Sequence, residues 1–235
     1  MDEQDKAMND VMGMEAKAPH GGRCILVCAG DFTPVDLARG EDDIIIAADN
    51  GLTYLNQMGI LPDYCIGDYD SLAPETEVAL EEIYRLDRSR VITLPKEKDD
   101  TDTMAAARLG LQLGYRRFDI YGALGGERFS HTMANIQTLL FLKSEGALGY
   151  IMDTNQMIFV LRNETKSFHP GFSGRFSMFA LEPVIRGVTI KGMKYELEDA
   201  ELTYSFPIGC SNEISDRAAS VTVKEGTALI VVGWE

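Results

Sequence analysis

The feature that most constrains the fold is an alternation of short apolar runs with helical patterns over the first two thirds of the chain. The runs at 24–28 and 44–48 are continuously apolar, which is typical of strands buried on both faces of a parallel sheet. Further strands are predicted at 64–66, 90–94, 118–121 and 150–152, and helices at 52–58, 74–86, 104–113 and 132–144. Thr33-Pro34 predicts one more short helix, with Thr33 as its N-cap. Alternating strands and helices indicate βαβ units, and therefore an α/β fold with a mostly parallel, helix-covered, Rossmann-like sheet.

The pattern changes near residue 153. Helical periodicity fades, and short β-branched and aromatic runs separated by glycines take its place. These runs lie at 157–160, 176–179, 188–190, 219–223 and 228–232. Strands at this spacing predict a small antiparallel β-sandwich or barrel. We therefore expect a polar N-terminal tail over 1–22, an α/β domain over 23–153 and a β-sandwich domain over 154–235.

The net charge of the chain argues against a nucleic-acid-binding protein. The charge is -15 at pH 7 and the isoelectric point is near 4.6, whereas such proteins are usually basic. No apolar run approaches the roughly 20 residues that cross a bilayer, and the first residues lack the apolar segment of a signal peptide. We therefore expect neither a nucleic-acid partner nor a membrane partner.

The cysteines predict the redox compartment. None of the four belongs to a C-x-x-C pair. Cys24 and Cys28 lie roughly 13 Å apart along a predicted strand, which is beyond the reach of a disulfide. We therefore expect four reduced thiols and a cytoplasmic protein.

Acidic residues cluster where three of the predicted strands end. The clusters contain Asp49, then Asp68 and Asp70, then Asp99, Asp100 and Asp102. Because ligands bind beyond the carboxyl ends of the strands in such sheets, the three clusters predict one metal-phosphate site. Carboxylates are usual Mg²⁺ ligands, so an acidic protein can bind ATP as its magnesium complex. Each cluster taken alone is explained at least as well as a helix start or an Asx-turn, and only their combination favours the metal.

A glycine-rich loop follows the predicted strand at 118–121. Gly125-Gly126 is not a P-loop, because no G-K-[ST] follows it. Arg128 comes next and is either a phosphate clamp or an ordinary surface arginine. Ser130 is predicted as the N-cap of the following helix, and His131 as a structural residue rather than a base.

The second domain contains one polar cluster that could bind a small molecule. It is formed by Ser211 and Asn212, between two predicted strands. Their side chains either hydrogen-bond a heterocyclic ligand or close a turn.

Taken in order, these motifs resemble those of the thiamin pyrophosphokinase family. Ala48-Asp49-Asn50-Gly51 is similar to its A-D-G-G element, Gly67-Asp68-Tyr69-Asp70-Ser71 matches its G-D-[FY]-D-S, and Asp99-Asp100-Thr101-Asp102 matches its D-x-T-D. The segment from Gly125-Gly126 to Asn135 resembles its G-G-x-R-x-D-H-x-x-A-N, and 187–195 and 211–213 resemble its thiamin-domain motifs. The resemblance covers roughly residues 23–233.

The resemblance implies transfer of pyrophosphate from ATP to the hydroxyl of thiamin, which gives thiamin diphosphate and AMP. It makes 23–153 the catalytic ATP and Mg²⁺ domain and 154–235 the thiamin-binding domain. It also implies a homodimer whose active sites lie between domains of opposite subunits. Carried over residue by residue, Asp68, Asp70 and Asp102 hold Mg²⁺ with Asp49 close by; Asn50, Lys98, Asp99, Thr101 and Arg128 border the nucleotide; Ser211, Asn212 and Ser130 lie at the thiamin. Asp70, Asp102 and Arg128 are the expected catalytic residues.

Three positions depart from the family pattern. Ser130 replaces the usual Asp, which removes a negative charge near the acceptor. Asn50 replaces a glycine, and Met104 stands where an acidic residue is frequent. The first departure leaves an alternative open, a thiamin or thiamin diphosphate sensor with little or no turnover. A nucleotide hydrolase that uses water as the acceptor is a third reading.

Overall fold

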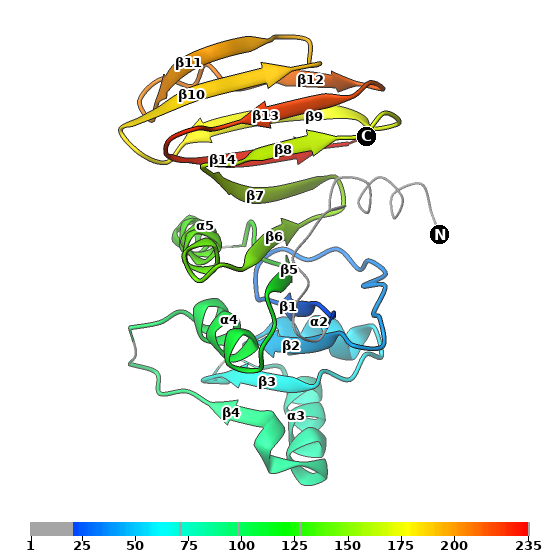
Figure 1. Cartoon of the computed structure of the whole chain (residues 1–235). Helices are drawn as coiled ribbons and strands as arrows, with labels where there is room; N and C mark the ends of the chain where they lie inside the picture. Colours follow the sequence, from blue (N-terminus) through cyan, green and yellow to red (C-terminus); the bar gives the residue numbers. More distant parts are fainter. Residues whose placement is uncertain (1–20, 71, 98, 127, 235) are drawn as a thin grey trace. The chain divides into compact units, whose positions relative to one another are not determined.

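The computed structural model describes residues 21–70, 72–97, 99–126 and 128–234 (Figure 1). The predicted tail over 1–22 therefore lies outside the described residues, apart from Gly21 and Gly22. The described chain forms two compact units, which divide between Thr154 and Asn155. Of the helices described, none has both the length and the apolar character needed to cross a membrane.

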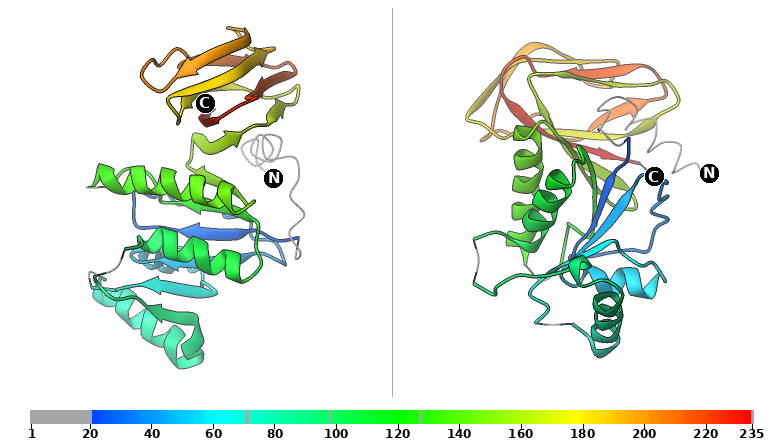
Figure 2. Two further views of the ribbon diagram at one scale, coloured as in Figure 1. Left: turned by 60° about the vertical axis from the view of Figure 1, so that its left-hand side comes forward. Right: turned by 60° about the horizontal axis from the view of Figure 1, so that its bottom comes forward.

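The first unit is a parallel sheet covered by helices. Its strands are β1 (Cys24–Val27), β2 (Ile44–Ala48), β3 (Tyr64–Gly67), β4 (Val91–Thr93), β5 (Arg117–Tyr121) and β6 (Leu148–Met152). Their order is β6-β5-β1-β2-β3-β4, and all neighbouring pairs are parallel. The helices are α2 (Gly51–Gln57), α3 (Pro74–Leu86), α4 (Asp102–Gln112) and α5 (Phe129–Ser144), with the short 3-10 helix η1 (Arg88–Arg90). Helices α4 and α5 cover one face of the sheet, and α2 and α3 the other (Figure 2). The predicted α/β class is confirmed.

The central strands are apolar along their whole length because both of their faces are covered. All four residues of β1 have no exposed surface, and Ile45 to Ala48 of β2 are at most 1% exposed. This burial explains why the sequence shows continuous apolar runs rather than an alternation.

Two local predictions in this unit are wrong. No helix forms at Thr33, and residues 32–39 have no regular structure. Ala38 has a left-handed φ of 43°, which a helix does not allow, and the guanidinium of Arg23 donates to the carbonyls of Leu37 (3.4 Å) and Ala38 (2.7 Å). Ser130 is not an N-cap: α5 begins at Phe129, and Arg128 takes the N-cap position without a side-chain hydrogen bond.

The second unit is a sandwich of two antiparallel sheets. One has the order β12-β9-β14-β7 and the other β11-β10-β13-β8. The strands are β7 (Gln156–Arg162), β8 (Thr165–Phe168), β9 (Ser173–Ala180), β10 (Val184–Lys191), β11 (Leu197–Thr203), β12 (Asn212–Ser215), β13 (Ala219–Thr222) and β14 (Thr227–Gly233). Phe168 of one sheet meets Phe176 of the other edge to face, with ring centroids 6.1 Å apart, so the two sheets share a core. The predicted sandwich is confirmed; β8, β11 and β12 were not predicted.

Candidate active site

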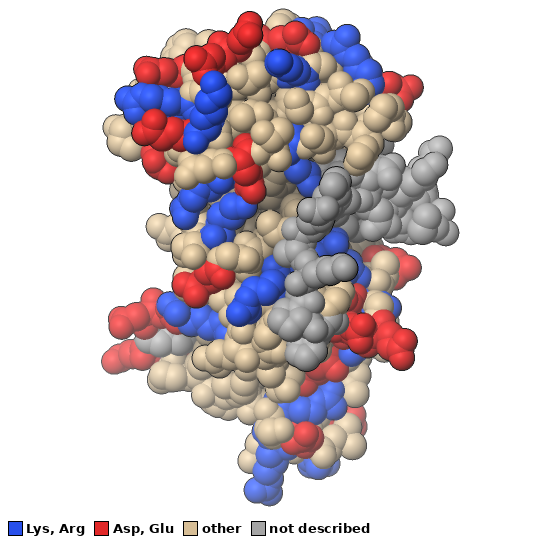
Figure 3. All heavy atoms as spheres, in the orientation of Figure 1, with Lys and Arg blue, Asp and Glu red and all other residues tan. Residues whose placement is uncertain are grey.

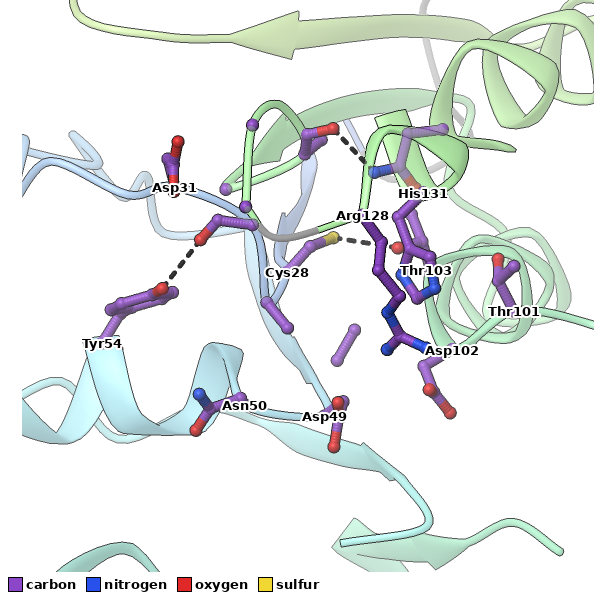
Figure 4. Close-up of a pocket in the computed structure, with 18 of the residues that line it drawn as sticks. Cys28, Asp31, Asp49, Asn50, Tyr54, Thr101, Asp102, Thr103, Arg128 and His131 are labelled. Carbon is purple, nitrogen blue, oxygen red and sulfur yellow. Dashed lines mark hydrogen bonds between the residues drawn. The ribbon is translucent and has the colours of Figure 1, made fainter. Parts of the chain in front are cut away.

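The carboxyl ends of β1, β2, β3 and β5 open onto a cavity of about 830 Å³ in the first unit (Figure 4). Seven of the predicted site residues line it: Asp49, Asn50, Asp68, Asp70, Thr101, Asp102 and Arg128. Asp99 and Ser130 do not line it, and Lys98 lies outside the described residues. The structure therefore brings together the acidic clusters of three separate strand ends.

One wall of the cavity is made of backbone where β1 meets β5. The Gly30 amide donates to the Gly122 carbonyl (2.7 Å), and the Asp31 amide donates to the Leu124 carbonyl (2.8 Å). A Cβ atom on Gly30 would lie 2.5 Å from the Leu124 oxygen, so only glycine fits there. Backbone atoms of this kind give a ligand a wall that does not change with side-chain rotamers.

The turn from β2 into α2 places Asp49 and Asn50 in the cavity. Asp49 has a left-handed φ of 51°, and Gly51 then begins the helix against β1. A Cβ atom on Gly51 would lie 1.9 Å from the Val27 carbonyl oxygen. The close approach of the helix to the strand therefore requires glycine, and it fixes the two polar side chains before it.

The surroundings of Asp49 are unfavourable to its negative charge. Its Oδ1 is buried without a hydrogen-bond partner among the described residues. Burial, with the neighbouring charges of Asp102, Asp68 and Asp70, raises the pKa of Asp49 above its usual value. A cation among these carboxylates would remove the repulsion.

The segment Asp68-Tyr69-Asp70 is not an extended strand. Tyr69 has a left-handed φ of 58°, and the Asp70 amide donates to Asp68 Oδ1 (3.2 Å) as in an Asx-turn. The two aspartates therefore form a turn at the end of β3, and both still line the cavity. Asp70 also forms an ion pair with Lys96, whose Nζ lies 3.0 Å from Asp70 Oδ2.

The D-x-T-D stretch starts α4. Thr101 is its N-cap and accepts a hydrogen bond from the Met104 amide (3.2 Å), with Asp102 in the first turn. Thr103 donates to the sulfur of Cys28 (3.4 Å) at the end of β1. Burial raises the pKa of the Cys28 thiol to about 12, so this cysteine stays protonated and is not a nucleophile.

Arg128 reaches into the cavity from the start of α5. Figure 4 shows its guanidinium on the side of the cavity where Asp102 and Asp49 lie. The loop before it is held by Asn135, whose amide donates to the Ala123 carbonyl (2.7 Å). Asn135 is only 6% exposed, so it anchors the loop from within the helix. An arginine in this place can pair with a phosphate.

Sequence reasoning did not identify several residues of the cavity. Asp31, Tyr54, Lys96 and His131 also line it. The Tyr54 hydroxyl donates to the Gly30 carbonyl (2.7 Å), and its ring stacks on Phe32. Tyr54 lies inside a helix with no motif around it, so no signal in the sequence marks it. Lys96 belongs to the charged stretch that precedes Asp99, and only the fold shows that it pairs with Asp70.

The cavity suits Mg²⁺ as part of a metal-nucleotide complex. Among the described residues, no three His, Cys, Asp or Glu side chains converge closely enough to form a complete metal site. Mg²⁺ usually binds through one or two carboxylates, several waters and substrate phosphates rather than a cage of protein ligands. The buried, unpartnered Oδ1 of Asp49 and the mutual repulsion of the carboxylates fit that mode of binding.

The two polar residues predicted in the second unit differ in their surroundings. Asn212 is 5% exposed, and its side-chain amide hydrogen-bonds to the backbone of Tyr195 and Glu213. Ser211 is exposed, has a left-handed φ of 63°, and its backbone amide donates to the hydroxyl of Ser177 (3.1 Å). Asn212 therefore positions the neighbouring loop, while Ser211 is exposed.

The fold and the cavity define an α/β protein with an acidic ligand site at the carboxyl edge of its sheet, joined to an antiparallel β-sandwich. The chain belongs to the thiamin pyrophosphokinase family. Residues 37–148 match the family's catalytic domain, and residues 167–228 match its vitamin B1 binding domain.

Individual relatives agree with this assignment. The chain is 25% identical over 201 residues to a thiamine pyrophosphokinase of Bacillus subtilis, covering 81% of this chain and 87% of that protein. It is 22% identical over 178 residues to thiamin pyrophosphokinase 1 of Caenorhabditis elegans, and this match covers 72% of this chain and 68% of that protein.

Solved structures share the fold. A crystal structure of the Bacillus subtilis protein has a TM-score of 0.79 at 22% identity and covers 91% of this chain and 99% of its own. The structure of thiamin pyrophosphokinase from Candida albicans has a TM-score of 0.73 at 18% identity and covers 91% of this chain and 90% of its own.

Proposed function

We propose that this protein transfers the pyrophosphoryl group of ATP to the hydroxyl of thiamin and releases thiamin diphosphate and AMP. The observation that carries the proposal is the cavity, because it collects carboxylates from three strand ends together with Arg128 in a chain of this family. Phosphoryl-type transfer needs positioning and charge neutralisation more than a covalent nucleophile. The protonated Cys28 is consistent with that chemistry.

The proposed roles follow from where the residues lie. Mg²⁺ would bind among Asp49, Asp68, Asp70 and Asp102, through one or two of these carboxylates together with water and substrate phosphates. It would neutralise phosphate charge when it is bound. Arg128 donates to phosphate oxygens and Lys96 adds a second cation at the rim, where it already pairs with Asp70. Thr101 caps the start of α4 and thereby positions Asp102 in the first turn of that helix. Ser130 does not line the cavity and is given no direct contact.

The second unit would bind thiamin. Family membership supports this role through the match over 167–228. We propose the Ser211 hydroxyl as a direct contact, and Asn212 as a residue that acts through the loop it holds. We also propose a homodimer and a cytoplasmic location; the four cysteines, all free thiols in the structure, are consistent with the latter.

Product analysis tests the proposal. The purified protein is incubated with Mg²⁺ and ATP, with and without thiamin, and AMP, ADP and thiamin diphosphate are quantified. We expect AMP that depends on thiamin and equals thiamin diphosphate in amount. AMP without thiamin would indicate a hydrolase, and ADP as the product would refute pyrophosphoryl transfer.

Two variants make this test specific to the cavity. Asp102→Asn removes one carboxylate from it and should abolish AMP formation. Glu81→Gln alters an exposed carboxylate of α3, which forms an i,i+4 ion pair with Arg85, and should leave activity unchanged. The comparisons give no support to a sensor without turnover.

A further inference from the structure

The side chain of Asn50 is held so that only one of its two polar groups is available to a ligand. Its Oδ1 accepts a hydrogen bond from the Thr53 hydroxyl (2.5 Å). Its Nδ2 has no hydrogen-bond partner among the residues that the structure describes. Figure 4 shows Asn50 at the cavity wall, with the amide nitrogen on the side of Tyr54 and the oxygen on the opposite side.

A chain of hydroxyl groups fixes this orientation. The Thr53 and Thr76 hydroxyl oxygens lie 3.0 Å apart. A hydroxyl has one proton, so Thr53, which donates to Asn50, must accept from Thr76. Thr76 lies in the first turn of α3 and is 1% exposed, so its side chain has little freedom. The order Thr76 to Thr53 to Asn50 therefore holds the amide oxygen in place and leaves the NH₂ group as a preorganised donor.

The chemistry of the donor selects the ligand atom. An asparagine that reads adenine uses its oxygen and its nitrogen together, and here the oxygen is already engaged. The remaining NH₂ group suits an acceptor, above all an anionic oxygen, because hydrogen bonds to charged groups are the strong ones. Asn50 directly follows Asp49, so it lies beside the carboxylates proposed to hold the metal.

We propose that Asn50 donates its amide N–H to a phosphate oxygen of the metal-bound polyphosphate, and that Thr53 and Thr76 are positioning residues for that contact. The inference rests on the proposed function in one respect, namely that Mg²⁺-ATP occupies this cavity. It adds a specificity-determining neutral donor to a site whose other proposed phosphate ligands are cations.

Calorimetric binding of two ligands tests the proposal without turnover. Mg²⁺-ATP contains the polyphosphate and the nucleoside, whereas Mg²⁺-tripolyphosphate contains the polyphosphate alone. We expect Asn50→Ala to weaken both by about tenfold or more, as for the loss of a hydrogen bond to a charged group. Asn50→Asp should weaken both further, since it replaces the donor with a negative charge of similar shape.

The positioning residues give a second, independent readout. Thr53→Val removes the donor that holds the amide oxygen, so the amide can rotate and affinity for both ligands should fall by less than in Asn50→Ala. Thr53→Ser restores the hydroxyl and should restore wild-type affinity. Asn56→Ala alters an exposed asparagine of the same helix and is the matched control.

The outcomes separate this inference from the proposed function. If Asn50→Ala weakens ATP but not tripolyphosphate, the amide contacts the nucleoside and the inference is wrong. If neither ligand is weakened, Asn50 makes no contact and the inference is wrong while the proposed function stands. If the wild-type protein binds neither ligand, the proposed function fails and this inference fails with it.

Discussion

Replacement of Asp43 by Asn should destabilise the first unit strongly. Asp43 lies just before β2, and its side chain is 6% exposed. Its Oδ1 accepts from the Arg23 backbone amide (2.6 Å). Its Oδ2 accepts from Arg23 Nε (3.0 Å), Arg23 Nη2 (2.7 Å) and the Gly40 amide (2.9 Å). An asparagine keeps one of these oxygens and turns an NH₂ group toward donors at the other.

The expected cost follows from that geometry. At least one buried donor loses its acceptor, and Arg23, which is 15% exposed in its side chain, loses one of its two short ion pairs. An unsatisfied buried donor costs about 1–3 kcal/mol, and breaking a buried ion pair costs about 3–5 kcal/mol. Because Arg23 keeps Asp119 at 2.8 Å, we expect a total of about 2–4 kcal/mol.

Spectroscopy can follow this unit separately. Every helix of the described chain belongs to the first unit, whereas Trp234, the single tryptophan, belongs to the second. Urea unfolding followed by circular dichroism at 222 nm therefore reports on the first unit, and tryptophan fluorescence reports on the second. Asp43→Asn should lower the midpoint of the helical signal at an unchanged slope. Glu81→Gln, in an exposed ion pair of the same unit, is the control and should change little.

The effect should depend on pH in one direction. Burial acts to raise the pKa of Asp43, but the hydrogen bonds from Arg23 and Gly40 outweigh it and leave the pKa below its usual value. The unfolded chain therefore binds this proton more tightly, and ionised Asp43 stabilises the fold above about pH 4. As the pH falls below this value, the gap between wild type and Asp43→Asn should narrow. A midpoint shift no larger than that of Glu81→Gln, or a gap that widens in acid, would refute the reasoning.

Three further substitutions separate the roles of single residues. Gly51→Ala should lower the free energy of unfolding by about 3 kcal/mol or prevent folding, because its Cβ would overlap the Val27 carbonyl at 1.9 Å. Gly146 has a φ of +71° and open space around it, so Gly146→Ala should lower this free energy by only about 1 kcal/mol in the same urea titration. Asp70→Asn should abolish thiamin-dependent AMP formation while the circular dichroism spectrum stays unchanged, and an active variant would contradict the metal assignment. Ser130→Asp should add about 0.5 kcal/mol of stability through the α5 N-terminus without changing turnover, since Ser130 does not line the cavity; a rise in the rate of AMP release would show that the site needs that charge.

The sequence predicts those parts of the fold that have a periodic signal. Strands β1 and β2 are identifiable because helices cover both faces and every residue is apolar. Strand β11 was missed because three of its seven residues are exposed acids, which hide the alternation: Glu198, Asp199 and Glu201. The segment at 32–39 was predicted wrongly because Thr33-Pro34 is a good local helix start, whereas a distant side chain, that of Arg23, decides its conformation.

The site shows the same division between local and distant causes. The acidic clusters were predictable because parallel strands bring their carboxyl ends to one edge of the sheet. Their detailed geometry was not: Asp68 and Asp70 lie in a turn because Tyr69 takes a left-handed conformation. Lys96 and Tyr54 reach the cavity from segments without a motif, so only the fold identifies them.

The two aspartates that flank β2 show how one residue type serves opposite purposes in this fold. Asp43, at the amino end, is surrounded by donors, and its lowered pKa means that its charge stabilises the native state. Asp49, at the carboxyl end, is half-buried beside like charges, and its raised pKa means that its charge opposes folding until a cation arrives. The strand itself is the same apolar run between them. Because the fold supplies donors to Asp43 but leaves Oδ1 of Asp49 without a partner among the described residues, the electrostatics support the ligand site proposed at the carboxyl end of β2.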